Sequence, residues 1–274
     1  MKYEPIKHSI DHFISRNPFF KRIFFRLVDL YLLRTWHVHK EIRKIKPFFK
    51  NGLHVLDAGA GFGQYSYWIL KKFKKTKITA IDISQSHVDK AQPFFDQSGF
   101  KGRAQFKQAD LTKYIAEGSF DVIISFDVME HIQEDRKVFI NFYKSLKNGG
   151  LLIISTPSDQ GGSGVHDHEH KNVGNASFID EHVRDGYGVE EIKEKLNTAG
   201  FSKVEVKFTY GIPGKLSWIL LMKFPISLLN ISKLYFILLP FYWIIVFPFC
   251  LILNYVDIMI KHKSGTGLMV KAFK

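Results

Sequence analysis

The sequence has a single cysteine, Cys250. One thiol excludes an internal disulfide framework and a zinc site built from cysteines, and it fits a reducing cytoplasm. The first residues also lack the features of a secretory signal. Residues 1–11 are polar, and the first apolar run is interrupted by Arg16, Lys21, Arg22 and Arg26. We therefore expect a protein that stays in the cytoplasm.

The middle of the chain has almost no net charge, although the whole chain carries +13. Residues 1–50 hold 12 Lys and Arg against 4 Asp and Glu, and residues 211–264 hold 5 against 1. Both basic segments are also rich in Phe, Leu, Ile, Tyr and Trp. Nucleic acid would match the charge alone, whereas anionic lipid headgroups match the charge and the apolar residues. The sequence therefore favours peripheral membrane contact over nucleic acid, and it makes no prediction of oligomeric state.

Residues 1–50 are expected to form basic amphipathic helices. From Phe13 to Phe49, apolar residues recur at helical spacing among basic ones. Such a helix can lie on a membrane, pack against the rest of the protein, or do both.

Residues 51–210 alternate short β-like runs with helical stretches, which indicates a parallel sheet with crossover helices. Residues 265–274 contain one more expected strand, Thr266–Phe273. We assign both ranges to one α/β domain. The expected strands are His54–Asp57, Lys77–Asp82, Ala104–Lys107, Asp121–Phe126, Leu151–Ser155 and Lys203–Tyr210, and the expected helices are Gln64–Phe73, His87–Gln97, Asp135–Leu146 and Val189–Ala199.

Residues 211–264 form a hydrophobic helical insertion before the last strand. The stretch Leu234–Val256 is uncharged and exceeds the roughly 20 residues that span a membrane. Pro240 and Pro248 are expected to interrupt it, because each removes a helical hydrogen bond. If the last strand rejoins the sheet, both ends of the insertion lie on one side of the membrane, which excludes a single crossing. A shallow re-entrant or surface-lying helical pair is favoured over a substrate lid buried against the domain.

The strongest motif is VLDAGAGFG at residues 55–63, an apolar strand followed by alternating glycines and then a helix. Glycines let the backbone approach a ligand closely, and the start of a helix offers unpaired N–H groups. Dinucleotide enzymes and methyltransferases share this motif. By itself, it does not determine the cofactor.

Acidic residues follow the next two strands. Asp82 lies about 20 residues after the glycines, at a strand end where a carboxylate can accept hydrogen bonds from a ribose diol. Gln108-Ala109-Asp110-Leu111 follows the third strand and suits an adenine edge. The fourth element runs through Ser125 to Asp127-Val128-Met129-Glu130-His131, and "LKNGGLLIIS" follows it.

These five elements in this order resemble the class I S-adenosylmethionine-dependent methyltransferases, particularly the small-molecule branch that includes the ubiquinone O-methyltransferases. The resemblance covers about residues 52–156. It implies a Rossmann-like seven-stranded sheet whose last strand is antiparallel, with S-adenosylmethionine across the carboxyl ends of strands one to four and S-adenosylhomocysteine as product. It also implies the cofactor-binding residues, namely Asp57, Gly59, Gly61, Gly63, Asp82, Ile83, Asp110, Leu111, Ser125 and Phe126.

His131 is the candidate general base, because imidazole titrates near neutrality and the position faces the cofactor in related folds. A structural hydrogen bond that caps the strand-to-helix turn is the alternative role. Asp127, Glu130 and His131 also resemble the divalent-metal element of some ubiquinone O-methyltransferases, which have Glu where this chain has Asp127. A divalent metal is therefore an alternative, but we do not favour it and assign no metal ligand.

Two further segments carry weaker signals. The cluster HDHEH at residues 166–170 lies in a polar loop without tetrahedral spacing, which favours a substrate loop over a metal site. Trp36 and His37 lie in a segment that either folds over the cofactor or forms a solvated helix face.

The sequence thus predicts a methyltransferase for a lipophilic small molecule, a phenolic, prenylated or acyl-chain acceptor, with O-methylation as the favoured reaction. We expect it at the inner face of the membrane as a peripheral or monotopic protein. The alternatives are a nucleic-acid methyltransferase and a membrane-binding module with a vestigial methyltransferase fold. Intact Asp57, Gly59, Gly61 and Asp82 argue against the vestigial module.

Overall fold

The computed structural model describes residues 17–45, 52–161 and 183–274. The centre of the fold is a seven-stranded sheet in the order β3-β2-β1-β4-β5-β7-β6. Strand β7 is antiparallel to both of its neighbours, and the other neighbouring strands pair in parallel. The predicted sheet with its final antiparallel strand is therefore confirmed. The strands are β1 (His54–Ala58), β2 (Lys77–Asp82), β3 (Ala104–Gln108), β4 (Phe120–Phe126), β5 (Leu146–Pro157), β6 (Lys203–Thr209) and β7 (Gly267–Phe273).

Helices cover both faces of the sheet, as expected for a buried parallel sheet. The domain helices are α4 (Gln64–Lys72), α5 (Gln85–Phe95), α6 (Asp135–Ser145) and α7 (Val189–Thr198), with short helical turns η2 (Asp96–Phe100) and η3 (Met129–His131). The N-terminal helices are α2 (Pro18–Tyr31) and α3 (Leu33–Lys44). Predicted and observed bounds of the domain helices differ by no more than two residues.

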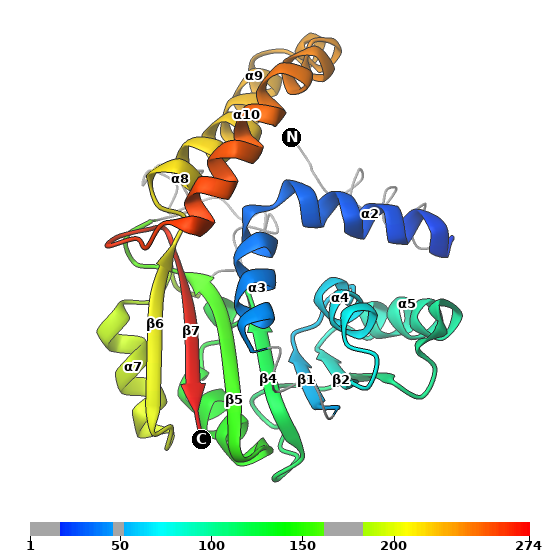
Figure 1. The fold of residues 1–274 in the computed structure, drawn as a ribbon, viewed down its shortest axis with the longest axis vertical. Helices are drawn as coiled ribbons and strands as arrows, with labels where there is room; N and C mark the ends of the chain where they lie inside the picture. The colour runs from blue at the N-terminus through cyan, green and yellow to red at the C-terminus, as the bar shows by residue number, and fades with distance from the viewer. Residues whose placement is uncertain (1–16, 46–51, 162–182) are drawn as a thin grey trace.

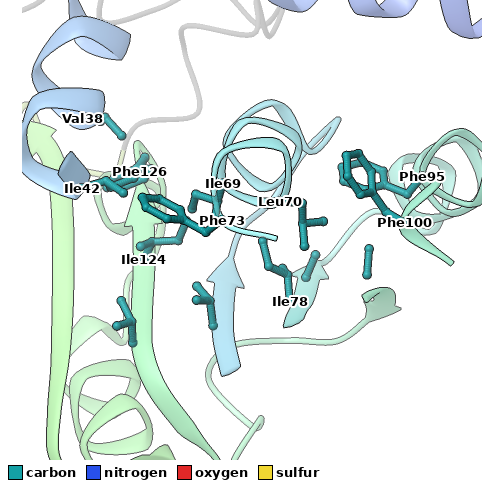
Figure 2. Close-up of a cluster of buried hydrophobic side chains, with 14 of the residues drawn as sticks. Val38, Ile42, Ile69, Leu70, Phe73, Ile78, Phe95, Phe100, Ile124 and Phe126 are labelled. Atoms are coloured by element: carbon teal, nitrogen blue, oxygen red, sulfur yellow. The ribbon is translucent and has the colours of Figure 1, made fainter. Parts of the chain in front are cut away.

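The core forms two layers because successive side chains of a strand point to opposite faces. On β1, Val55 packs in the layer beneath α3, α4 and α5, whereas Leu56 packs in the layer beneath α6 and α7. Figure 2 shows the first layer, in which Val38 and Ile42 of α3 lie beside Phe126 of β4. Helix α3 is therefore part of the domain core. One of the two N-terminal helices thus packs against the rest of the protein, as one of the alternatives above expects.

Residues 212–259, here called the arm, form an antiparallel helical pair between β6 and β7. Figure 1 shows the arm projecting away from the sheet beyond the carboxyl ends of the parallel strands. Two helical stretches are long and apolar enough to cross a membrane by length and composition, Ile212–Ile231 and Leu239–Met259. The arm comprises α8 (Ile212–Trp218), η4 (Ile219–Lys223), α9 (Phe224–Ile231), η5 (Lys233–Ile237) and α10 (Leu239–Met259).

The expected interruption near Pro240 is present, where η5 ends and α10 begins, whereas the one expected at Pro248 is wrong. Pro240 lies in the first turn of α10, where its missing N–H would be unpaired in any case, and Pro248 lies inside the continuous helix. Contacts with the other half of the arm hold α10 on both sides of Pro248. The Tyr242 hydroxyl donates to the carbonyl of Leu220, and Cys250 Sγ lies 3.9 Å from the carbonyl of Ser217. Such packing compensates for one lost hydrogen bond.

The base of the arm is joined to α3 by four residues, here called the root cluster: His37, Gly214, Asp257 and His262. The Asp257 side chain is fully buried. Its Oδ1 lies 2.8 Å from His37 Nε2, and its Oδ2 accepts from the Gly214 N–H at 2.8 Å. His262 Nε2 lies 2.8 Å from the Asp257 carbonyl oxygen. A buried carboxylate needs such partners, so the root cluster fixes the arm to the domain.

Candidate cofactor and acceptor site

The glycine loop between β1 and α4 is bound to the end of β2. The N–H groups of Gly59 and Ala60 donate to the carbonyl of Ile81 at 2.8 and 2.9 Å, and the Gly61 N–H donates to Asp82 Oδ2 at 2.7 Å. The predicted proximity of the glycines to Asp82 is therefore present in the structure.

The glycines have different reasons to lack a side chain. Gly59 has φ +83°, and a Cβ there would lie 2.3 Å from Val128 Cγ2. Gly63 has φ +82°, and its Cβ would lie 2.7 Å from the ring of Phe95. At Gly61, with φ +53°, a Cβ would meet nothing within 4 Å. Gly59 and Gly63 thus allow close packing, whereas Gly61 borders open space where a ligand can approach the backbone.

Asp82 is held as a carboxylate. Its Oδ1 accepts from the Ser84 N–H at 2.9 Å and lies 3.0 Å from His87 Nδ1. Burial alone would raise the pKa of this carboxyl, but the hydrogen bonds from His87, Ser84 and Gly61 outweigh burial and lower it. An ionised carboxylate accepts hydrogen bonds and cannot donate, which is what a ribose diol requires.

Asp57 is in a different environment beneath the loop. Its side chain is buried, and Oδ2 accepts from the Ser66 hydroxyl at 2.6 Å. Burial raises the pKa of Asp57 to about 7, while the Ser66 hydrogen bond opposes that rise. The two acids at this end of the sheet therefore differ, since the pKa of Asp57 is raised and that of Asp82 is lowered.

The residues assigned to the adenine side lie after β2 and β3. The N–H of Ala109 donates to the carbonyl of Asp82 at 3.0 Å, which brings the two strand ends together. Ile83 is 73% exposed, whereas Leu111 is buried in the core. Asp110 Oδ1 accepts from the backbone and hydroxyl of Thr112, and these bonds lower the pKa of Asp110. At the carboxyl edge of the sheet, Ile83 thus presents an apolar side chain and Asp110 presents a carboxylate.

The end of β4 forms the floor of the site. Ser125 is fully buried, and its hydroxyl has no hydrogen-bond partner among the described residues. Phe126 packs edge-on against Tyr65 at 4.8 Å between ring centroids. Asp127 adopts φ +52°, which is unusual for a residue with a side chain. An unpaired buried hydroxyl beside a backbone of this kind is typical of a ligand site.

His131 ends the turn η3, directly after this floor. Its side chain is exposed, and its N–H donates to the carbonyl of Val128 at 3.0 Å. Neighbouring Glu130 points the other way, is buried, and accepts from the Thr156 hydroxyl at 3.2 Å. Within the described parts of the chain, no group of three His, Cys, Asp or Glu side chains could hold a metal ion. The 166–170 cluster lies outside the described residues.

Three residues without a predicted role also lie at this edge. Arg34 of α3 forms an ion pair with Asp127. Tyr210, which follows β6, adopts φ +56°, interacts with Arg34 and lies 6.1 Å from the His37 ring between centroids. Tyr65 is half-buried and lies near the same arginine. Helix α3 therefore does lie over the site, but it presents Arg34, while His37 belongs to the root cluster.

A model of the methyltransferase domain family matches residues 49–200, more than half of the chain. The chain belongs to the methyltransferase domain family. The predicted class, the S-adenosylmethionine-dependent methyltransferases of class I, and S-adenosylmethionine as the cofactor are therefore confirmed for the domain. The open space at Gly61, the ionised Asp82 and the unpaired Ser125 hydroxyl fit this cofactor.

Named relatives support the same conclusion. The domain is 33% identical over 157 residues to phosphoethanolamine N-methyltransferase 1 of Zea mays, covering 57% of this chain and 29% of the relative. It is 32% identical over 128 residues to malonyl-[acyl-carrier protein] O-methyltransferase 2 of Ilyobacter polytropus, covering 47% of this chain and 48% of the relative. The chain thus matches less than a third of the length of the maize protein.

Solved structures share the fold. Phosphoethanolamine N-methyltransferase 2 of Haemonchus contortus, in complex with S-adenosyl-L-methionine, superposes with a TM-score of 0.58 at 21% identity, covering 92% of this chain and 60% of that chain. A putative sarcosine dimethylglycine methyltransferase from Galdieria sulphuraria gives 0.56 at 16% identity, covering 86% and 82%. The resemblance to the ubiquinone O-methyltransferases stays a prediction.

Proposed function

We propose that this protein transfers the methyl group of S-adenosylmethionine to a lipophilic small molecule at the cytoplasmic surface of a membrane. The supporting observation is the position of the arm, whose exposed apolar helices project from the same edge of the sheet as the glycine loop. An acceptor dissolved in the bilayer would reach this edge without crossing water.

Different residues of the chain would bind the cofactor and accept the proton of the acceptor. Asp82 and Asp110 would hold the adenosine part of the cofactor, and the open backbone at Gly61 would admit its methionine part. S-adenosylmethionine supplies an electrophilic methyl group when bound. Methyl transfer then requires alignment of the acceptor and exclusion of water. For a hydroxyl acceptor, an imidazole nitrogen of His131 would take the proton, because its side chain is exposed beside the floor of the site.

An amine acceptor is the second candidate. Plant relatives named as phosphoethanolamine N-methyltransferases are 31–33% identical to this domain. An amine on a membrane-borne molecule would fit the same site and the same arm.

One experiment tests the reaction. The protein is incubated with isotope-labelled S-adenosylmethionine and a membrane lipid extract, and the products are analysed by mass spectrometry. We expect label in the lipid fraction, on oxygen for the first candidate and on nitrogen for the second. His131→Ala should lose transfer to a hydroxyl while its affinity for S-adenosylhomocysteine is unchanged. Parallel incubations contain nucleic acid or free phosphoethanolamine in place of the lipid extract, and label found solely in these would contradict a lipophilic acceptor.

A second measurement tests the cofactor site. Asp82→Ala should weaken S-adenosylhomocysteine binding by about 30- to 150-fold, because a charge-assisted hydrogen bond contributes about 2–3 kcal/mol. Calorimetry gives the dissociation constant. Asp89→Ala, at an exposed acid on the neighbouring α5, is the matched control and should bind normally. Equal binding by the unmodified protein and both variants would show that Asp82 does not contact the cofactor.

A further inference from the structure

Helix α2 has a continuous apolar face that points away from the domain. Phe25 marks the centre of the buried face of α2. Because successive residues of a helix are rotated by about 100°, the exposed apolar side chains lie on the side opposite Phe25. Their exposed fractions range from 37% to 59%. They are Phe19, Phe20, Ile23, Leu27 and Leu30.

The orientation of α2 is fixed by its inner face. The Phe25 ring packs against Tyr67 and Phe94 at 5.5 and 5.6 Å between centroids. Lys21 is buried on the same side, with Nζ 4.7 Å from the Phe94 ring and donating to the carbonyl of Lys90. Since the inner face packs against the domain, the outer face points away from the domain.

Basic side chains border this outer face and the base of the arm. Arg22 and Arg26 of α2 are exposed and lie on one flank of the apolar strip. Lys215, Lys261 and Lys263 are exposed at the base of the arm. An apolar strip beside arginines is the pattern of a helix that lies in a membrane interface with anionic headgroups.

Helix α2 and the arm meet at Tyr31. Its hydroxyl donates to the carbonyl of Leu221 at 2.7 Å, and its ring stacks on Phe247 at 6.1 Å between centroids. Figure 1 shows both elements beyond the carboxyl ends of the parallel strands. The arm rises from this side while α2 runs across it, so one bilayer surface can contact both.

We propose that the outer face of α2 and the arm together form one binding surface for an anionic lipid leaflet. The arm enters the acyl region, and its longest helix, α10, has 21 residues, about 30 Å at 1.5 Å per residue. Helix α2 lies at the headgroup level, with Arg22 and Arg26 beside lipid phosphates. This inference rests on the membrane location proposed above, and it is independent of which acceptor is methylated.

The test measures partition of the full chain into vesicles by flotation. Vesicles of phosphatidylcholine alone are compared with vesicles of equal parts phosphatidylcholine and phosphatidylglycerol. The double variant Arg22→Gln/Arg26→Gln should bind the anionic vesicles roughly 30-fold more weakly, since each basic residue contributes about 1 kcal/mol near an anionic surface. Its binding to phosphatidylcholine should change little.

The matched control is Lys77→Gln/Lys101→Gln, which removes two exposed lysines at the opposite, amino edge of the sheet. It should partition like the unmodified protein. Equal losses in both double variants, or no loss in either, would overturn the inference. S-adenosylhomocysteine affinity is measured for every variant, so a failure of the cofactor site is seen separately from a failure of lipid binding.

A second copy of this chain is the other occupant that the apolar strip could accept. Leu27→Ser distinguishes the two, because it removes an apolar side chain that is 57% exposed. Weaker partition with an unchanged sedimentation coefficient in detergent supports the lipid surface. Conversion of a dimer to a monomer with unchanged partition would assign this face to self-association and overturn the proposal.

Discussion

Asp57 and Asp82 lie at the ends of neighbouring strands, and their surroundings give the two carboxyl groups opposite properties. Asp82 receives hydrogen bonds from two backbone N–H groups and lies beside His87, while Asp57 is buried and is bonded by Ser66. A nearby positive charge favours the ionised form of a carboxyl group. The pKa of Asp57 should therefore fall when a cationic cofactor binds.

The raised pKa of Asp57 predicts a pH-dependent stability. The unfolded carboxyl loses its proton near pH 4 and the folded one near 7, so the folded state binds more protons between these values. The contribution of Asp57 to stability therefore falls as the pH rises from about 4 to 7. Asp57→Asn should gain stability relative to the unmodified protein over this range, on the order of 3–4 kcal/mol.

Denaturant titrations at several pH values measure this difference. Asp121→Asn is a useful control, since that acid lies at the opposite end of the sheet, where it pairs with Lys147. A stability difference for Asp57→Asn that is independent of pH would show that the folded carboxyl titrates normally.

At the scale of elements, α3 connects the domain to the arm. It packs on the sheet through Val38 and Ile42, contacts Asp127 through Arg34, and binds Asp257 through His37. A displacement of the arm would therefore be transmitted to the residues beside the floor of the site.

Asp257→Leu should destabilise the protein by about 3–5 kcal/mol, because the partners of a buried carboxylate lose their hydrogen bonds together. Chemical denaturation in detergent micelles measures the change. Limited proteolysis should also cut earlier near residues 211–214. The control Glu194→Ala breaks an exposed ion pair with Arg136 and should change stability little. Equal costs for both variants would mean that the root cluster does not hold the arm.

Features that depend on local contacts were predictable from the sequence, and features that depend on distant contacts were not. The strands, the glycine loop and Asp82 were predictable because each depends on a short sequence pattern. The ion pair of Arg34 and the bond between His37 and Asp257 were not, because the partners are far apart in sequence. The helix through Pro248 was missed for a related reason, since contacts within the arm override a local preference.

At the scale of the whole molecule, the arm exposes a large apolar surface near its tip. Ile245 is 76% exposed and Phe241 is 66% exposed. Soluble monomers rarely show apolar patches larger than a few hundred Å². The arm therefore accounts for much of the exposed apolar surface and should dominate the behaviour of the purified protein.

The double variant Phe241→Ser/Ile245→Ser should float poorly with vesicles and bind less detergent, while unfolding at the same denaturant concentration. Flotation and sedimentation in detergent provide the measurements. Ile140→Ser alters an exposed apolar residue on α6 and should float like the unmodified protein. If the tip variant floats as well as the control, the arm does not enter the bilayer.

The pairing of Thr209 with Gly267 has a consequence for how such a protein is assembled and modified. Because the arm leaves and re-enters the sheet at facing residues of adjacent antiparallel strands, the two chain ends are already joined by the ladder. The loop-closure entropy of an added segment grows slowly with its length. One insertion at a hairpin turn is therefore enough to add a long apolar element to this sheet, and a short turn in its place should leave the pairing of β6 with β7 intact.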